Sequence, residues 1–154
     1  MLDGLALRWC FRSRLADAAP PPHDQALLVD TTGELGWWWG TATIAFVGGS
    51  LDGQRGGQNM LEPSAYGAAV AFGPHTQNFR DEVRRLLDAE AAVVVADGPE
   101  LTAFVAWCLD DPDGAASLGR KAADLVASQR GAVAATARLI LDRLPAFPGR
   151  RPHT

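Results

Sequence analysis

Five short apolar segments, separated by turns and polar stretches, set the pattern of this chain. In the first, Leu7, Trp9 and Phe11 alternate with arginines and a cysteine, and this period of two favours a half-buried strand over a helix. The other four are apolar runs without alternation, which is typical of strands covered on both faces. They cover residues 26–29, 44–47, 69–72 and 92–95.

Helical patterns fill most of the space between and after these runs. Threonines and a glutamate at residues 31–35 suit the start of a helix that carries three tryptophans, and residues 59–63 look like a capped helix start with Pro63 in its first turn. Residues 79–88 place their apolar side chains on one face. From Pro99 the pattern is helical throughout, apart from a turn at residues 111–114, until Pro145 ends it.

Segments rich in glycine or proline predict where the chain forms loops between its strands and helices. Residues 17–24 contain three consecutive prolines and predict a surface connection, whereas the glycine-rich residues 51–58 predict a flexible loop. Short apolar strands that alternate with helices imply parallel pairing. We therefore expect an α/β fold, a Rossmann-like parallel sheet with helices on both faces, formed by residues 1–144 and followed by a polar tail, residues 145–154.

Composition narrows the class of protein. A chain of 154 residues and 16.3 kDa has the size of one domain, and its net charge of −4 argues against a nucleic-acid partner. Cys10 and Cys108 lie far apart and without metal-like spacing, so we expect reduced thiols in a cytosolic protein. No apolar run is long enough to cross a bilayer, and the first residues do not resemble a signal peptide.

Candidate chemistry gathers where strands end. Glycine-bearing segments follow three of the predicted strands: residues 33–35, residues 48–50 together with 56–59, and residues 73–78. Backbone amides at such turns can hold a phosphate, and a carboxylate such as Glu62 can accept both hydroxyls of a ribose. The alternative interpretation is that these segments are only tight turns.

Other conspicuous residues carry weaker hypotheses. His75 is a general acid, an anion donor or a turn residue, and the last interpretation is favoured. The tryptophans at 37–39 must leave one ring partly exposed, which makes Trp38 or a neighbour a candidate interdomain contact. The arginines at 80, 84 and 85 are most simply a solvated helix face, and no metal-ligand set is visible.

Four motifs, in this order, resemble a known family. They are Val29-Asp-Thr-Thr-Gly-Glu-Leu35, Ala45-Phe-Val-Gly-Gly-Ser50, Gly56-Gly-Gln-Asn-Met-Leu-Glu-Pro63 and Phe72-Gly-Pro-His-Thr-Gln-Asn-Phe-Arg80. The chain resembles, over residues 7–143, the C-terminal domain of bacterial 3-deoxy-D-manno-octulosonic acid (Kdo) transferases. The resemblance implies a glycosyltransferase-B architecture of two Rossmann-like domains that moves Kdo from CMP-Kdo to the lipid A precursor at the cytoplasmic face of the inner membrane.

The resemblance also assigns roles to residues. It implies that CMP contacts Gly33, Glu34 and Leu35 in one stretch and Asn59, Met60, Leu61 and Glu62 in another. The Kdo sugar would face Gly49, Ser50, His75, Gln77 and Asn78. CMP-Kdo is the donor substrate, and no cofactor or metal is expected. No catalytic residue is expected in this chain, because the catalytic glutamate of the family belongs to an N-terminal domain that also meets the lipid acceptor.

This sequence departs from the family in several ways. Gln58 stands where the family often has histidine, and the loop at residues 51–55 is about one residue longer than in common relatives. Family members are more than twice as long, so transfer by the isolated chain is not expected. In the doubly wound order, a central strand is also absent between the strands at residues 7–11 and 44–47. We therefore expect self-association, strand swapping, marginal stability or direct pairing of those two strands.

Three functional interpretations remain at this point. The first is part of the donor site of a Kdo transferase. The second is a non-catalytic nucleotide-binding half-domain that acts with a separate N-terminal half. The third is a different sugar-nucleotide transferase on the same scaffold, such as a hexosamine transferase.

Overall fold

The structure is a computed structural model that describes residues 7–15 and 26–143. The chain divides into two compact units, Met1–Ala42 and Thr43–Thr154, and each is described by itself. The predicted proline-rich connection, residues 17–24, and the predicted polar tail, residues 145–154, lie outside the described residues.

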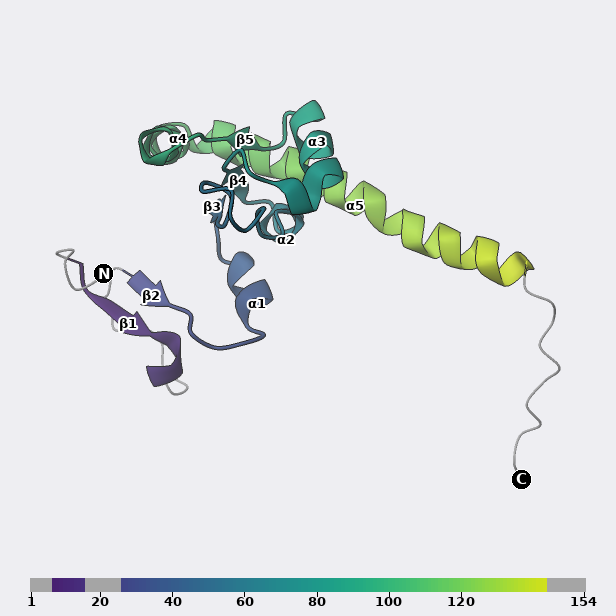
Figure 1. Cartoon of the computed structure of the whole chain (residues 1–154), viewed down its shortest axis with the longest axis horizontal. Helices are drawn as coiled ribbons and strands as arrows, with labels where there is room; N and C mark the ends of the chain where they lie inside the picture. Colours follow the sequence, from purple (N-terminus) through teal and green to yellow (C-terminus); the bar gives the residue numbers. More distant parts are fainter. Residues whose placement is uncertain (1–6, 16–25, 144–154) are drawn as a thin grey trace, which may run out of the picture. The chain divides into compact units, whose positions relative to one another are not determined.

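The first unit holds a two-stranded parallel sheet. Strand β1, Trp9–Phe11, pairs with β2, Ala26–Leu28, with Trp9 opposite Ala26. A 3₁₀ turn at Arg12–Arg14 follows β1, and the short helix α1, Leu35–Trp39, follows β2 (Figure 1). The alternating pattern is explained by the rings of Trp9 and Phe11, which lie on one face of the strand and meet edge to face at 4.9 Å.

The second unit holds a three-stranded parallel sheet in the order β3-β4-β5. Strands β3, Ile44–Val47, and β4, Ala69–Phe72, have the predicted bounds, whereas β5 is limited to Val93–Val94. Ile44 lies opposite Ala69, and Ala71 lies opposite Val93. The α/β class and the parallel pairing predicted from the apolar runs are confirmed.

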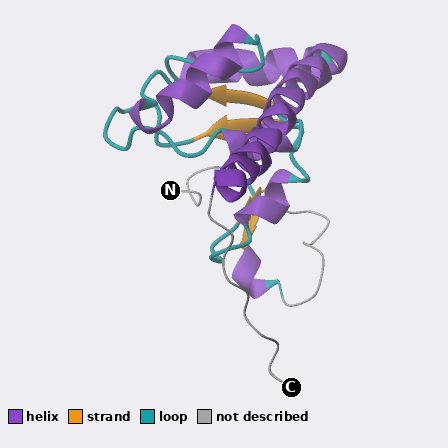
Figure 2. Cartoon of the chain, turned by 90° about the vertical axis from the view of Figure 1, so that its right-hand side faces the viewer, coloured by secondary structure: helices purple, strands orange, loops and turns teal. Residues whose placement is uncertain are grey.

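Both faces of the central strand β4 are covered, because all four of its residues are buried. Ala69 and Ala71 point to a core cluster that includes Phe104, Cys108 and Ala115 from the two long helices. Those helices are α4, Gly98–Asp110, and α5, Pro112–Arg143. Figure 2 shows the strands of this unit between helices. The continuous apolar character of Ala69–Phe72 is therefore explained by burial on two sides.

The remaining helices occupy predicted positions. Helix α2, Leu61–Ala65, has Pro63 in its first turn, and α3, Arg80–Asp88, buries Leu86 while exposing an ion pair between Arg84 and Asp81. The prediction that the arginines of this helix form a solvated face is confirmed, because Arg80, Arg84 and Arg85 are all exposed.

The break before the last helix is shorter than predicted. We expected a turn at residues 111–114, but α5 already begins at Pro112. Proline suits the first helical position, and the Oδ1 atom of Asp111 accepts a hydrogen bond from the Gly114 N–H at 2.9 Å. One capping residue therefore separates α4 from α5.

Glycine allows α5 to pack closely on the turn before β4. A Cβ atom added at Gly119 would collide with the carbonyl oxygen of Gly67 and lie 3.1 Å from the carbonyl carbon of Ala68. Helix α5 packs against both α2 and β4. The absence of a side chain at Gly119 thus sets how near the helix lies to the sheet.

The five described strands form two separate sheets rather than one. Strand β1 pairs with β2, and β3 pairs with β4, but no pairing joins β1 to β3 within residues 7–15 and 26–143. Direct pairing of these two strands, one of the expected outcomes, stays a prediction, because β1 and β3 belong to different units. Across the same residues, no helix combines the length and the apolar character needed to cross a membrane.

Candidate functional site

One buried hydroxyl joins the loops that follow β3 and β4. Ser50 is fully buried, and its Oγ atom donates to the carbonyl oxygen of Val47 at 2.6 Å and accepts from the Gly73 N–H at 2.8 Å. The His75 N–H then donates to the carbonyl oxygen of Ser50 at 2.9 Å. The carboxyl ends of two neighbouring parallel strands, where ligands bind in open α/β sheets, are thereby held together.

The glycine-rich loop returns to the end of β3. The Gly57 N–H donates to the Gly49 carbonyl at 2.8 Å, and the Gln58 N–H donates to the Gly48 carbonyl at 3.2 Å. Gly49 and Gly57 have φ angles of 70° and 85°, which glycine adopts without strain. The loop has no regular secondary structure, as predicted, but hydrogen bonds hold its base closed, so the prediction of a flexible loop needs this correction.

The segment after β4 packs on the same loop. The Asn78 side-chain amide donates to the Arg55 carbonyl at 2.8 Å, and the Asn78 N–H donates to the Gly56 carbonyl at 3.1 Å. The His75 ring lies 3.3 Å from the position that a Cβ atom would take at Gly53. Gln77, between them, is exposed. Predicted sugar-facing residues from two segments therefore meet at one edge of the sheet.

The predicted stretch Asn59 to Glu62 begins beside this edge, because Gln58 is bonded to Gly48. Asn59 Oδ1 accepts from the Leu61 N–H at 3.1 Å, and Asn59 Nδ2 donates to Glu62 Oε1 at 3.1 Å. Met60 is fully buried, so its backbone rather than its side chain is available to a ligand. Glu62 is exposed in the first turn of α2, and Asn59 restricts its carboxylate.

The third predicted stretch, Gly33 to Leu35, lies in the other unit, after β2. Glu34 Oε2 lies 3.0 Å from Arg12 Nε and accepts a hydrogen bond from Thr31 Oγ1 at 2.8 Å. Gly33 has a φ angle of 89°, and Leu35 is about half exposed. Arg12 and Thr31, which belong to the same unit, thus hold the Glu34 carboxylate, and these contacts restrict the backbone of the segment around Glu34.

A second carboxylate at this end of β2 was not among the predicted site residues. Asp30 accepts from the Ser13 N–H at 2.9 Å and from Ser13 Oγ at 2.6 Å. The Ser13 hydroxyl, followed by the Ser13 N–H, lowers the pKa of Asp30 below its ordinary value of 3.8. These bonds join the loop after β1 to the loop after β2, as Ser50 joins those after β3 and β4.

The sequence contained a signal for this missed group. Arg12 and Ser13 come directly after the first predicted strand, and Asp30 comes directly after the second. The rule that strand ends of a parallel sheet share one edge places all three together. When this rule is applied to the end of every predicted strand, and not only to the strand ends that carry glycine turns, it identifies Arg12, Ser13 and Asp30 as candidate site residues.

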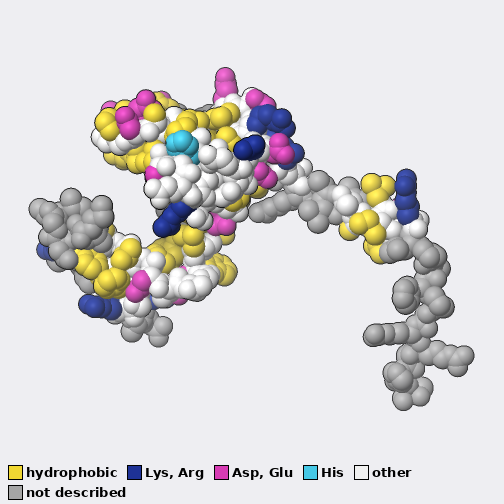
Figure 3. All heavy atoms as spheres, viewed as in Figure 1, with side chains coloured by type: hydrophobic (Ala, Val, Ile, Leu, Met, Phe, Trp, Pro, Cys, Tyr) yellow, Lys and Arg dark blue, Asp and Glu magenta, His cyan; other side chains and the backbone are white. Residues whose placement is uncertain are grey.

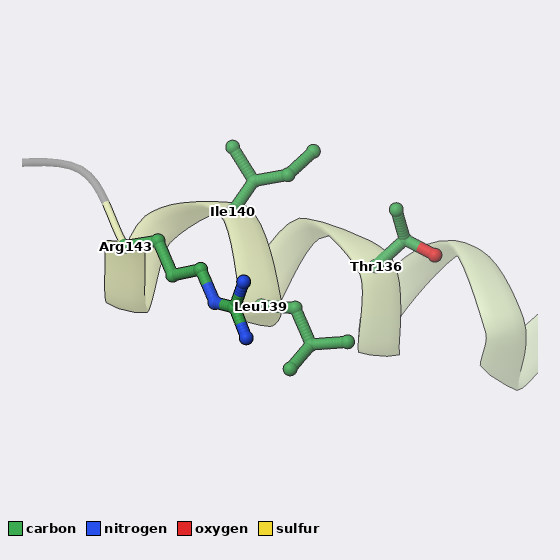
Figure 4. Close-up of a pocket in the computed structure, with 4 residues that line it drawn as sticks. All are labelled: Thr136, Leu139, Ile140 and Arg143. Carbon is green, nitrogen blue, oxygen red and sulfur yellow. The ribbon is translucent and has the colours of Figure 1, made fainter.

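The structure also shows surface features formed by residues that were not predicted to bind a ligand. Trp107 and Leu109 of α4 are exposed, and hydrophobic and acidic side chains lie together on the surface over this helix (Figure 3). Thr136, Leu139, Ile140 and Arg143 of α5 line a surface depression of about 460 Å³ (Figure 4). Trp37 of α1 is 80% exposed, as one of the three tryptophans was expected to be. No cluster of three or more His, Cys, Asp or Glu side chains suited to a metal ion occurs within the described parts of the chain.

Curated proteins that are similar to this chain include 3-deoxy-D-manno-octulosonic acid transferases. No family model matches the chain. It is 34% identical over 143 residues to a 3-deoxy-D-manno-octulosonic acid transferase of Bordetella pertussis, a match that covers 93% of this chain and 33% of that protein. A protein of the same description from Haemophilus influenzae is 34% identical over 124 residues, or 80% of this chain and 29% of that protein. The chain therefore spans about a third of the curated relatives it matches.

A solved structure shares the fold. The crystal structure of the C-terminal CMP-Kdo binding domain of WaaA from Acinetobacter baumannii is 29% identical, with a TM-score of 0.73, and the match covers 80% of this chain and 63% of that one. Sequence and fold thus agree with the resemblance of the four motifs. The chain belongs to the 3-deoxy-D-manno-octulosonic acid transferase family and is similar to its C-terminal domain.

Proposed function

We propose that this chain forms the donor side of a Kdo transferase and binds CMP-Kdo at the carboxyl ends of its parallel strands. The observation that carries the proposal is the convergence of Gly49, His75, Gln77 and Asn78 with the start of α2, through the bonds of Ser50 and Gln58. The name of the A. baumannii domain supports the same ligand. The donor is a substrate, and the proposal includes no metal or other cofactor.

Glu62 is the residue we assign to the ribose of CMP. A carboxylate can accept hydrogen bonds from both ribose hydroxyls, and the bond from Asn59 Nδ2 to Glu62 Oε1 reduces the freedom of the side chain before the nucleotide arrives. The backbone amides around Asn59 are assigned to the phosphate. His75, Gln77 and Asn78 are assigned to the Kdo sugar.

Glu34 has a different role in this proposal. Its carboxylate already interacts with Arg12 and Thr31, so we assign it to holding the backbone of Gly33 and Leu35 against CMP rather than to direct binding. An Arg12→Ala variant should then weaken CMP binding even though Arg12 touches no ligand in this assignment.

Transfer itself requires residues outside the proposed donor side. A base must take the proton of the acceptor hydroxyl while that oxygen attacks the anomeric carbon of Kdo and CMP leaves. We place this base, and the contacts to the lipid A precursor at the cytoplasmic face of the inner membrane, in an N-terminal domain. The chain alone is then expected to bind the donor without transferring Kdo.

The test is a calorimetric titration of the full chain with CMP. Glu62→Gln should weaken binding by about 10- to 100-fold, since hydrogen bonds to a charged acceptor are lost. Glu82→Gln is the matched control, because Glu82 also lies in the first turn of a helix, α3, but is not assigned to any part of the ligand. The affinity of the Glu82→Gln variant for CMP should stay within about twofold of the affinity of the unaltered chain.

Two results would contradict the proposal. Absence of CMP binding by the chain would remove the donor-side function, and equal binding by Glu62→Gln would remove the role of Glu62. A transfer assay with CMP-Kdo and the lipid acceptor tests whether the catalytic base lies outside this chain. Activity of the chain alone would show that the base lies within it, and activity only after a separate N-terminal half is added would favour the half-domain alternative.

A further inference from the structure

The glycine-rich loop, residues 51–58, carries one arginine, Arg55, whose side chain is exposed. The ion pairs formed among residues 7–15 and 26–143 do not include Arg55. Asp52 is the acidic residue of the same loop, and its Oδ1 atom accepts a hydrogen bond from the Gln54 N–H at 3.1 Å. Since a guanidinium is charged at any physiological pH, Arg55 adds a positive charge that the described residues do not neutralise.

Asn78 holds the backbone of Arg55 from the neighbouring loop. Its side-chain amide donates to the Arg55 carbonyl at 2.8 Å, and its N–H donates to the Gly56 carbonyl at 3.1 Å. This close approach requires glycine at position 56, because a Cβ atom there would lie 2.9 Å from Asn78 Nδ2. The two bonds fix the backbone from which the Arg55 side chain extends, and a fixed backbone reduces the entropy lost when a ligand binds.

The stem of Arg55 lies along Gly49. A Cβ atom added at Gly49 would be 3.3 Å from Arg55 Cβ, 3.6 Å from Arg55 Cδ and 3.8 Å from Gln58 Cγ. Because the guanidinium is bonded to Cδ, it lies beside Gly49 too, and all of these residues belong to the second unit. The charge is thus placed next to a residue assigned to the sugar and close to the segment that leads to Asn59.

The proposed donor, CMP-Kdo, carries two anionic groups on one carbon. In an octulosonic acid the anomeric carbon bears the carboxylate, and in the activated sugar the same carbon bears the phosphate of CMP. The backbone amides around Asn59 are assigned to the phosphate, and the residues assigned to the sugar include no permanent cation. A guanidinium suits the remaining group, because two of its N–H groups can donate to the two oxygens of one carboxylate.

We propose, resting on the donor-binding function proposed above, that Arg55 binds the carboxylate of the Kdo sugar. Asn78 then has a positioning role, because it holds the backbone of Arg55. The contact makes the site select an acidic sugar over an uncharged one, since an uncharged sugar would leave the guanidinium without a partner at this position.

Calorimetric titration of the full chain with CMP and with CMP-Kdo tests this assignment. The quantity compared is the preference for the sugar nucleotide, the Kd for CMP divided by the Kd for CMP-Kdo. Arg55→Gln should lower this preference about tenfold, because a charged, bidentate contact is lost, while the Kd for CMP changes by less than about twofold. Arg84→Gln removes the same charge from the exposed face of α3, where Arg84 pairs with Asp81, and should leave both Kd values within about twofold.

A modified ligand tests the same contact without altering the protein. The methyl ester of CMP-Kdo at the sugar carboxylate retains the phosphate and loses the second charge. The unaltered chain should bind this ester about tenfold more weakly than CMP-Kdo, whereas Arg55→Gln should bind the two with nearly equal affinity. Because the Arg55 side chain is exposed, the free energy of unfolding should be the same in the variant and the unaltered chain.

Three results would overturn the assignment of Arg55. An unchanged preference in Arg55→Gln removes the contact, and an equal loss of affinity for CMP and CMP-Kdo assigns Arg55 to the phosphate instead. Loss of the preference in Arg80→Gln but not in Arg55→Gln assigns the carboxylate to Arg80, the exposed first residue of α3. Absence of CMP binding by the unaltered chain contradicts the proposed function itself, and the role of Arg55 with it, so the two failures are distinguishable.

Discussion

Ser50 Oγ accepts a hydrogen bond from the Gly73 N–H at 2.8 Å, although 23 positions separate the two residues in the sequence. The same hydroxyl donates to the carbonyl of Val47, so one buried side chain connects the ends of β3 and β4. Gly73 is also required for the contact, because a Cβ atom there would collide with the Ser50 carbonyl oxygen. The proposed sugar-facing loops are therefore positioned by a group that is itself buried.

Ser50→Ala should destabilise the second unit by about 2–4 kcal/mol, because it leaves the Gly73 N–H and the Val47 carbonyl without this partner in a buried site. The measurement is the free energy of unfolding from urea titration. Ser64→Ala is the matched control: Ser64 is also fully buried, but its hydroxyl donates to the carbonyl of Met60, the residue directly before α2, and so makes a local contact. We expect about 1 kcal/mol or less for it. Equal losses in the two variants would show that the connection between the loops adds nothing.

Two glycines of α5 should respond to alanine with opposite sign. Gly119→Ala places a methyl group against the Gly67 carbonyl, so α5 must move from the sheet, at a cost of about 1–3 kcal/mol. Gly131→Ala meets no atom within 4 Å and should stabilise the helix by up to about 1 kcal/mol. Thermal unfolding followed by circular dichroism measures both. Stabilisation by Gly119→Ala would contradict the close packing of α5 on β4.

The strands were predicted well where burial on two sides leaves a continuous apolar run. The strands at residues 44–47 and 69–72 end before glycines and have the predicted bounds. The apolar run at residues 92–95 predicted a longer strand than β5, which has two residues, because an apolar run indicates which residues are buried and not which of them pair with a neighbouring strand. The start of α5 was misplaced because Asp111 and Pro112, typical of turns, are also typical of a helix cap and first position.

The contacts that organise the site could not be predicted from spacing. The Gly73 N–H donates to Ser50 Oγ, and Ser13 Oγ donates to Asp30, so these bonds connect residues 23 and 17 positions apart. The rule of shared strand ends brings such residues to one edge, but which atoms bond there depends on the register of neighbouring strands. Sequence patterns indicated which strand ends carry glycines and polar groups. They contained no information on which hydroxyl would be buried between them.

Cys108 should be chemically inert in the folded chain. It is 3% exposed in the core cluster, and desolvation raises the pKa of its thiol, so the reactive thiolate is scarce. In a Cys10→Ser variant, a thiol-specific reagent at pH 8 should react at least about 100-fold more slowly than in denaturant, since access requires local opening. The reciprocal Cys108→Ser variant reports on Cys10, which is partly exposed and should react faster. Similar rates with and without denaturant would contradict the burial of Cys108.

The contact between Ser13 and Asp30 should make the first unit sensitive to acid. Because the folded pKa of Asp30 is lower than its ordinary value of 3.8, the charged carboxylate favours the folded state. This contribution to the stability of the folded state is fully present at pH values well above 3.8, where Asp30 is ionised in the unfolded chain too. It is lost as the pH falls below 3.8 and through the lower pKa of the folded state.

Carboxyl carbon NMR of Asp30 measures the titration directly. Ser13→Ala removes the largest cause of the shift while retaining the bond from the Ser13 N–H, so the Asp30 pKa should rise in this variant but remain below 3.8. An unchanged titration would show that the hydroxyl does not hold the carboxylate, and that the loops after β1 and β2 are joined by other contacts.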